Sequence, residues 1–100
     1  MNIVQISKVL SNQTRVSILK WLKNPAQNFP PHQDLGHFND GVCVQYIQKK
    51  VNLSQSTVSH YLSLMEKAGL VKPIRHGKWT YYKRNEELIT EYINLLKIEL

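Results

Sequence analysis

Only three residues, Val51 to Leu53, separate two helical segments in the middle of this sequence, and few folds accommodate that arrangement. Apolar residues recur at helical spacing over Val42–Lys50 and again over residues 54–68. Ser54 is a good cap for the second segment, because its hydroxyl can accept a hydrogen bond from a free N–H of the first turn. Gly69 suits the left-handed position that ends a helix. A short helix, a tight turn and a longer helix form the helix-turn-helix plan.

A β-hairpin is predicted immediately after the second of these helices. Leu70–Ile74 and Lys78–Lys83 have the composition of strands, and the second segment is rich in aromatic residues. Gly77 between them supplies the turn. We therefore expect a winged helix-turn-helix, in which the hairpin is the wing.

Further helices are predicted on both sides of this unit. The first covers Ile3–Leu10, and Asn12 caps a second one, which ends before Pro25 because proline cannot continue it. The next segment, up to Gly41, contains three prolines and two glycines and is expected to be a loop. A last helix begins at Asn85. The predicted fold class is mainly α with a β-hairpin wing, in the order α-α-α-α-β-β-α.

Basic residues dominate the middle of the chain. The sequence has 13 Lys and Arg against 7 Asp and Glu, a formal net charge of +6, and between Gly41 and Arg84 the only acid is Glu66. Such a surface attracts nucleic acid or anionic membranes. No apolar run approaches the roughly 20 residues that span a bilayer, and the N-terminus does not resemble a signal peptide. We therefore expect a cytoplasmic protein with double-stranded DNA, and no membrane, as its partner.

The first turns of the predicted second helix of the helix-turn-helix carry polar residues that suit base contacts. This helix enters the major groove and reads bases near its N-terminus, and a basic hairpin tip can hold phosphates or a minor groove. The expected DNA-binding residues are Ser54, Gln55, Ser56, Thr57, Ser59 and His60 in the helix and Arg75, His76 and Lys78 in the wing. Additional phosphate contacts are expected mostly from Lys49, Lys50, Lys72, Lys78 and Arg84. For Arg15, the sequence is equally consistent with a phosphate contact and with a structural salt bridge.

The last predicted helix has more apolar residues than one buried stripe requires. An exposed remainder would be an unusual patch, and pairing with the first helix across a two-fold axis would cover it. We therefore expect a single domain over residues 1–100, with dimerisation helices at both ends. The expected dimer interface consists of Ile3, Ile6, Leu10, Leu88, Tyr92, Leu95 and Leu96.

Several stretches resemble the ArsR/SmtB family of transcriptional repressors. Leu53–Leu62 and the following Lys67–Val71 are similar to the recognition-helix signature of that family, and Arg75–Tyr82 is similar to its wing. Asn12–Leu19 resembles the start of its second helix. The resemblance implies a homodimer built on the first and last helices, and repression of a promoter that an effector relieves.

The metal-sensing residues of that family are not matched. Many members carry Glu-Leu-Cys-Val-Cys-Asp-Leu on the third helix, but here Cys43 stands at the first cysteine and Gln45 replaces the second. One thiolate cannot hold a soft metal alone. The loop residues His32, Asp34 and His37 are a conceivable ligand set, although such polar loop residues are more often solvated. We expect no cofactor and no metal effector, and we interpret Cys43 as a small core residue rather than a redox switch.

The sequence is less consistent with functions other than a DNA-binding repressor. No Gly-rich phosphate loop or paired catalytic acids are evident, so we expect no enzyme. Within DNA binding, the repressor could instead be displaced by a partner protein or by oxidation of Cys43. Outside it, the alternative is a winged-helix module that binds protein without specific DNA binding, against which the basic hairpin argues. RNA binding is disfavoured because no aromatic stacking platform is evident outside the presumed core residues.

Overall fold

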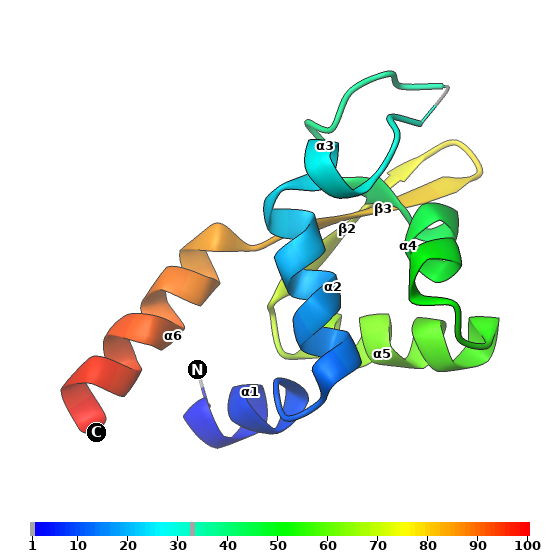
Figure 1. Cartoon of the computed structure of the whole chain (residues 1–100). Helices are drawn as coiled ribbons and strands as arrows, with labels where there is room; N and C mark the ends of the chain where they lie inside the picture. Colours follow the sequence, from blue (N-terminus) through cyan, green and yellow to red (C-terminus); the bar gives the residue numbers. More distant parts are fainter. Residues whose placement is uncertain (1, 33) are drawn as a thin grey trace.

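The computed structural model describes residues 2–32 and 34–100 and folds them into six helices and one three-stranded antiparallel sheet (Figure 1). In chain order the elements are α1 (Ile3–Val9), α2 (Gln13–Lys23), α3 (Pro25–Asn28), β1 (Val42–Cys43), α4 (Val44–Val51), α5 (Gln55–Lys67), β2 (Val71–His76), β3 (Trp79–Arg84) and α6 (Glu86–Glu99). Among the described residues, no helix has the length and apolar character that crossing a membrane requires.

Short polar side chains fix where the main helices begin. The side-chain oxygens of Asn12, Ser54 and Asn85 each accept a hydrogen bond from the N–H three residues later, at the starts of α2, α5 and α6. The predicted caps Asn12 and Ser54 are therefore confirmed. Gly69 ends α5 at a φ of 83°, as predicted, and Asn52 turns the chain between α4 and α5 at a φ of 57°. Asparagine is among the few residues that adopt this left-handed conformation readily.

Two short elements depart from the predicted order. The expected loop begins with the single helical turn α3, because a proline is well accommodated at the first position of a helix, so Pro25 both ends α2 and starts α3. Val42 and Cys43, expected in a helix, form β1, which pairs with Tyr82 and Tyr81 of β3. The order is therefore α-α-α-β-α-α-β-β-α. The predicted class, mainly helical with a β-hairpin, is confirmed.

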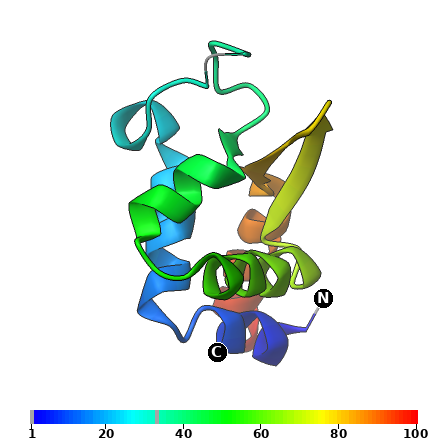
Figure 2. The ribbon, with the colours of Figure 1, turned by 90° about the vertical axis from the view of Figure 1, so that its right-hand side faces the viewer.

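The core lies between the sheet and helices α2, α4 and α5. The side chains of Ile18, Ile47, Val58, Leu62 and Met65 are completely buried there. The sheet order is β1-β3-β2, and Figure 2 shows the β2–β3 hairpin rising from the end of α5. On the other side of the molecule, α6 leads away from the sheet and passes beside α1 (Figure 1). The hairpin tip and the α1–α6 pair thus occupy opposite ends of the molecule.

The loop that follows α3 is held to the sheet by an enclosed histidine. The His32 ring lies 4.8 Å from the Trp79 ring, 5.5 Å from Tyr81 and 5.4 Å from Tyr46, measured between ring centroids. The Tyr81 hydroxyl is 3.0 Å from Nδ1 of His32, and both residues are buried. Phe29 is buried as well and pins the loop to the core. The sheet, α4 and the loop therefore share one aromatic cluster.

Burial raises the pKa of the Tyr81 phenol, and the neighbouring Cys43 adds to the shift. Between the ordinary tyrosine pKa of about 10 and the raised value, the folded protein keeps a proton that the unfolded chain releases. Stability is therefore expected to fall as pH rises through this window. In Tyr81→Phe, stability should fall less steeply with pH. The variant should also lose about 1 kcal/mol of unfolding free energy at pH 8, because the contact with His32 is lost.

Urea unfolding at pH 8 and at alkaline pH measures this difference. Some dependence of stability on pH should persist in the Tyr81→Phe variant, because burial also raises the pKa of Tyr82. An equally steep loss of stability in Tyr81→Phe and the unaltered protein would contradict the assignment to Tyr81.

Candidate nucleic-acid interface

The first turn of α5 is fixed by its cap. The Ser54 hydroxyl accepts a hydrogen bond from the Thr57 N–H at 3.2 Å and donates one to Thr57 Oγ1 at 2.7 Å. Ser54 Oγ also lies 3.3 Å from Ser56 Oγ. Of the predicted base-reading residues, Ser54 and Thr57 therefore use their hydroxyls within the helix start. Their role is to shape the N-terminus of α5.

The outward face of α5 carries the other four predicted residues. Gln55 and Ser59 lie one turn apart, as do Ser56 and His60, so the four share one face of the helix. All four are exposed, whereas Val58 on the opposite face is completely buried. The helix thus presents hydrogen-bonding side chains to solvent, while its opposite face is packed in the core. Such a surface can form donor and acceptor pairs with the edges of bases.

The hairpin tip places two exposed cations at the end of the sheet, Arg75 in β2 and Lys78 in the turn. Arg75 pairs with Thr80 and His76 with Trp79 in the register of β2 and β3. The Arg75 guanidinium folds back across the tip, donating from Nε to the Gly77 carbonyl at 2.9 Å. Lys78 Nζ lies 5.0 Å from the centroid of the Trp79 ring. Both cations remain exposed and can bind phosphate oxygens.

His76, the third predicted wing residue, is engaged elsewhere. Its Nε2 lies 2.7 Å from Oδ2 of Asp40, in the loop before β1. Next to this pair, Lys83 Nζ donates to the Asn39 carbonyl at 2.8 Å. These contacts tie the loop to the hairpin. His76 therefore connects two parts of the protein through its contact with the Asp40 carboxylate.

Two of the basic residues considered for phosphate contacts, Arg84 and Arg15, form contacts within the fold. Arg84 donates to both carboxylate oxygens of Glu86 at 2.9 Å, which lowers the pKa of that carboxyl, and to the Leu19 carbonyl at 3.2 Å. Arg15 donates from Nε to the Val9 carbonyl at 2.6 Å and lies 5.0 Å from the Tyr61 ring centroid. These internal partners leave the Arg84 side chain little exposed, which argues against its expected phosphate role. Arg15 binds carbonyls at the end of α1, where a cation is favourable, and forms no salt bridge within the described residues. Its phosphate contact stays a prediction.

Exposed basic side chains remain on both sides of the α4–α5 pair. Lys49 and Lys50 belong to the last turn of α4, and Lys72 to β2. Because Lys72 faces Lys83 across the hairpin, two positive charges meet on one surface of the wing.

The residues expected to form a dimer interface divide into two groups. Ile6 and Tyr92 are buried within the subunit, where the Tyr92 hydroxyl lies 2.7 Å from Ser7 Oγ, so they are not available to a partner. The others are partly exposed: Ile3, Leu10, Leu88, Leu95 and Leu96.

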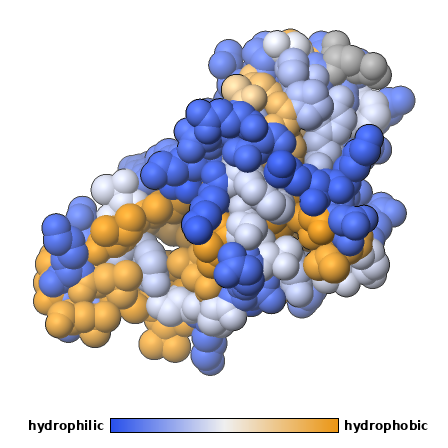
Figure 3. Space-filling model, viewed as in Figure 1, coloured by the Kyte–Doolittle hydropathy of each residue, from blue (hydrophilic) through white to orange (hydrophobic). Residues whose placement is uncertain are grey.

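The more exposed apolar side chains near α1 and α6 were missed. They are Val4 at 62%, Ile93 at 50%, Ile98 at 79% and Leu100 at 94% of full exposure. Figure 3 shows apolar residues gathered over α6 and the neighbouring part of the molecule, and a groove of about 550 Å³ lies between the two helix ends. The excess of apolar residues in the last helix was the signal for this surface, but only the fold shows which of them face outward.

The residues considered as metal ligands have other roles. Nδ1 of His32 accepts from the Asp34 N–H at 3.2 Å, and Nδ1 of His37 accepts from the Asn39 N–H at 3.3 Å. Cys43 is a buried free cysteine in β1, as the core interpretation predicted. Within residues 2–32 and 34–100, no group of three His, Cys, Asp or Glu side chains is arranged to hold a metal ion.

The α4–α5 pair and the β2–β3 hairpin together define a winged helix-turn-helix, a class of DNA-binding domain. Within this class the chain belongs to the ArsR family of bacterial transcriptional regulators. The model of that family, described as "Bacterial regulatory protein, arsR family", matches residues 42–72. This match, together with relatives that span almost the whole chain, confirms the predicted family, which is a family of regulators rather than of enzymes.

Similar proteins span almost the whole chain. It is 45% identical to an uncharacterised HTH-type transcriptional regulator, YbzH, of Bacillus subtilis (strain 168), over 97% of both chains. It is 32% identical to the putative arsenical resistance operon repressor ArsR2 of Halobacterium salinarum, over 94% of this chain and 70% of the relative.

Solved structures share the fold at lower sequence identity. A homodimeric winged helix-turn-helix DNA-binding domain, Mb0332 of Mycobacterium bovis, has a TM-score of 0.66 at 22% identity, covering 97% of this chain and 77% of that one. NolR of Sinorhizobium fredii has a TM-score of 0.64 at 22% identity, covering 93% and 78%.

Proposed function

We propose that this protein is a homodimeric repressor that binds a specific operator. The N-terminal half of α5 enters the major groove, and the hairpin tip contacts the DNA backbone or the minor groove. The observation that carries the proposal is the exposed polar face of α5, formed by Gln55, Ser56, Ser59 and His60, beside a hairpin tip with two exposed cations. Base choice comes from the helix, and phosphate binding from Arg75, Lys78 and the exposed lysines of α4 and β2.

The apolar surface of α1 and α6 supports the dimer. It places exposed Val4, Ile93 and Ile98 at the end of the molecule opposite the hairpin, and the structural relative from Mycobacterium bovis is described as homodimeric. In this proposal residues 1–100 form one DNA-binding domain with dimerisation helices at both ends. Two copies of α5 then reach successive major grooves about 34 Å apart.

Repression is supported by a relative of the chain. The relative from Halobacterium salinarum is described as a putative repressor. A site for a soft metal is not part of the proposal, because Cys43 lies buried and the loop histidines bond to neighbouring backbone.

The test is binding of the purified protein to DNA from directly upstream of its own gene, measured by fluorescence anisotropy over a salt series. Tight, sequence-selective and salt-sensitive binding supports the proposal. Parallel titrations with Zn²⁺ and with an oxidant reveal whether either one releases the DNA. Equal affinity for random DNA at moderate salt would overturn the operator function and favour a winged-helix module that binds another protein.

Two substitutions should separate base reading from phosphate binding. Gln55→Ala is expected to reduce the preference for operator over random DNA about tenfold, because it removes a side chain that can pair with a base edge. Arg75→Ala should weaken binding to all sequences alike and reduce the salt slope by about 1. Competition binding measures both effects.

Gln27→Ala, an exposed glutamine on α3 far from α5 in the chain, is the control and should change neither. An unchanged sequence preference in Gln55→Ala would show that the assigned reading face is wrong.

A further inference from the structure

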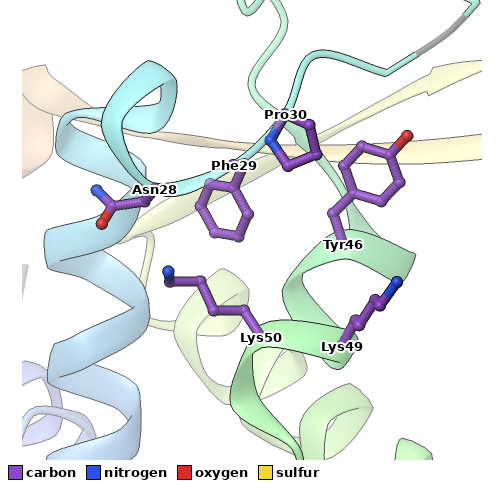
Figure 4. Close-up of a pocket in the computed structure, with 6 residues that line it drawn as sticks. All are labelled: Asn28, Phe29, Pro30, Tyr46, Lys49 and Lys50. Carbon is purple, nitrogen blue, oxygen red and sulfur yellow. The ribbon is translucent and has the colours of Figure 1, made fainter.

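A pocket beside α4 is not used by the proposed DNA contacts of α5 and the hairpin. It has a volume of about 360 Å³ and opens between α4 and the chain that follows α3 (Figure 4). Ligand pockets commonly begin at about 300 Å³, so this space admits one small organic molecule. Its lining residues are Asn28, Phe29, Pro30, Tyr46, Lys49 and Lys50.

The pocket has flat, apolar walls that are held in place. The Phe29 ring is buried and stands opposite α4, and the rings of Pro30 and Tyr46 continue the wall (Figure 4). The Asn28 side chain donates to the Asn24 carbonyl at 2.9 Å and to the Trp21 carbonyl at 3.4 Å, which secures α3 against α2. A planar ring is the shape that stacks well against such walls.

The charge of the pocket has one sign. Lys49 and Lys50 are its only charged lining residues, and within the described part of the chain neither forms an ion pair. Lys50 Nζ lies 5.2 Å from the Trp21 ring centroid and 5.7 Å from that of Phe29. The ammonium group therefore stays against the aromatic wall, where it can donate to an anion that enters the pocket.

We propose that this pocket binds a small aromatic carboxylate. The ring lies against Phe29 and Tyr46, and the carboxylate accepts a hydrogen bond from Lys50, while Lys49 adds a second positive charge to the lining. A second consequence rests on the proposed function: both lysines belong to the first helix of the helix-turn-helix and are available to DNA phosphates. A bound carboxylate offsets one of their two positive charges and weakens operator binding.

Tryptophan fluorescence tests the binding without DNA. The chain has two tryptophans, so Trp79→Phe leaves Trp21, beside Lys50, as the only one. Benzoate is the probe, benzyl alcohol supplies the ring without the charge, and acetate supplies the charge without the ring. We expect saturable quenching by benzoate, with at least tenfold weaker binding of the other two. NMR shifts on adding benzoate should concentrate at residues 28–30 and 46–50.

Variants of the lysines locate the site. Lys50→Gln should weaken benzoate binding at least tenfold, and Lys50→Arg should retain most of it. Lys20→Gln, an exposed lysine on α2, should leave the affinity unchanged. Circular dichroism checks that each variant is folded, and Tyr46→Ala provides an independent change to the apolar wall that should also weaken binding.

Three results would overturn the proposal. The first is the absence of a saturable response to benzoate up to about 10 mM in fluorescence or NMR. The second is an affinity for acetate equal to that for benzoate. The third is tighter binding of inorganic phosphate than of benzoate, which would make the site a contact for the DNA backbone. Benzoate binding that leaves operator affinity unchanged would overturn only the regulatory consequence. A failure of operator binding itself, with benzoate still bound, would overturn the proposed function and leave the pocket assignment standing.

Discussion

Gly41→Ala is expected to destabilise the protein by about 3 kcal/mol or more, because both its backbone and its surroundings exclude a side chain. Gly41 has a φ of 91°, which disfavours any residue with a Cβ. A Cβ there would also overlap the Tyr82 carbonyl oxygen and lie 2.9 Å from the Lys83 backbone nitrogen. Since these are backbone atoms of the central strand β3, they cannot move aside without disrupting the sheet.

Gly77→Ala is the matched control for this substitution. Gly77 has a φ of 58°, but nothing lies within 4 Å of a Cβ built on it. Its cost should be limited to the conformational penalty, about 1 kcal/mol. Urea unfolding followed by circular dichroism gives both free energies. Equal costs for the two variants would mean that the close approach of Gly41 to β3 does not limit this position.

Ile93→Glu is expected to separate the dimer and lower operator affinity about 100-fold. Ile93 is half-exposed on α6 in the single subunit, so glutamate can be accommodated there without disturbing the core. In a dimer built on α1 and α6, the same glutamate would be buried without a partner, which is costly. Once the subunits separate, each half-site is bound alone and the advantage of linked binding is lost.

Sedimentation velocity and operator titration measure the two effects. Asn94→Glu adds the same charge at the next position of α6, an exposed polar one, and should leave both the dimer and the affinity nearly unchanged. A dimeric Ile93→Glu variant with normal affinity would place the interface elsewhere. A monomeric variant that still binds operator tightly would show that the dimer is not needed for recognition.

The elements that follow local rules were predictable from the sequence. The extent of α5 follows from Ser54, its apolar periodicity and Gly69, all within one segment of the chain. The hairpin is equally local, because its two strands are joined by Gly77. By contrast, β1 exists because Val42 and Cys43 pair with residues about 40 positions later, and a two-residue strand has no periodicity of its own.

The candidate site was predictable in chemistry but only partly in role. Polar residues at the start of α5 were identified, but charge alone did not distinguish exposed cations from those with an internal partner. Arg84 binds the Leu19 carbonyl, 65 positions away, and His76 meets Asp40, 36 positions away. Such partners are set by the tertiary fold. The neighbouring Glu86 was the one local sign that Arg84 is already paired.

The enclosed His32 also determines how the long loop can move. Its ring is surrounded by side chains from α4 and β3, and it is buried together with Tyr81. Local opening of a segment requires breaking the buried contacts that hold it. The amide hydrogens of a well-anchored segment therefore exchange with solvent as slowly as those of the core. His32 therefore leaves this enclosure only when the sheet opens. The His32 anchor and the β2–β3 hairpin accordingly belong to one cooperative unit.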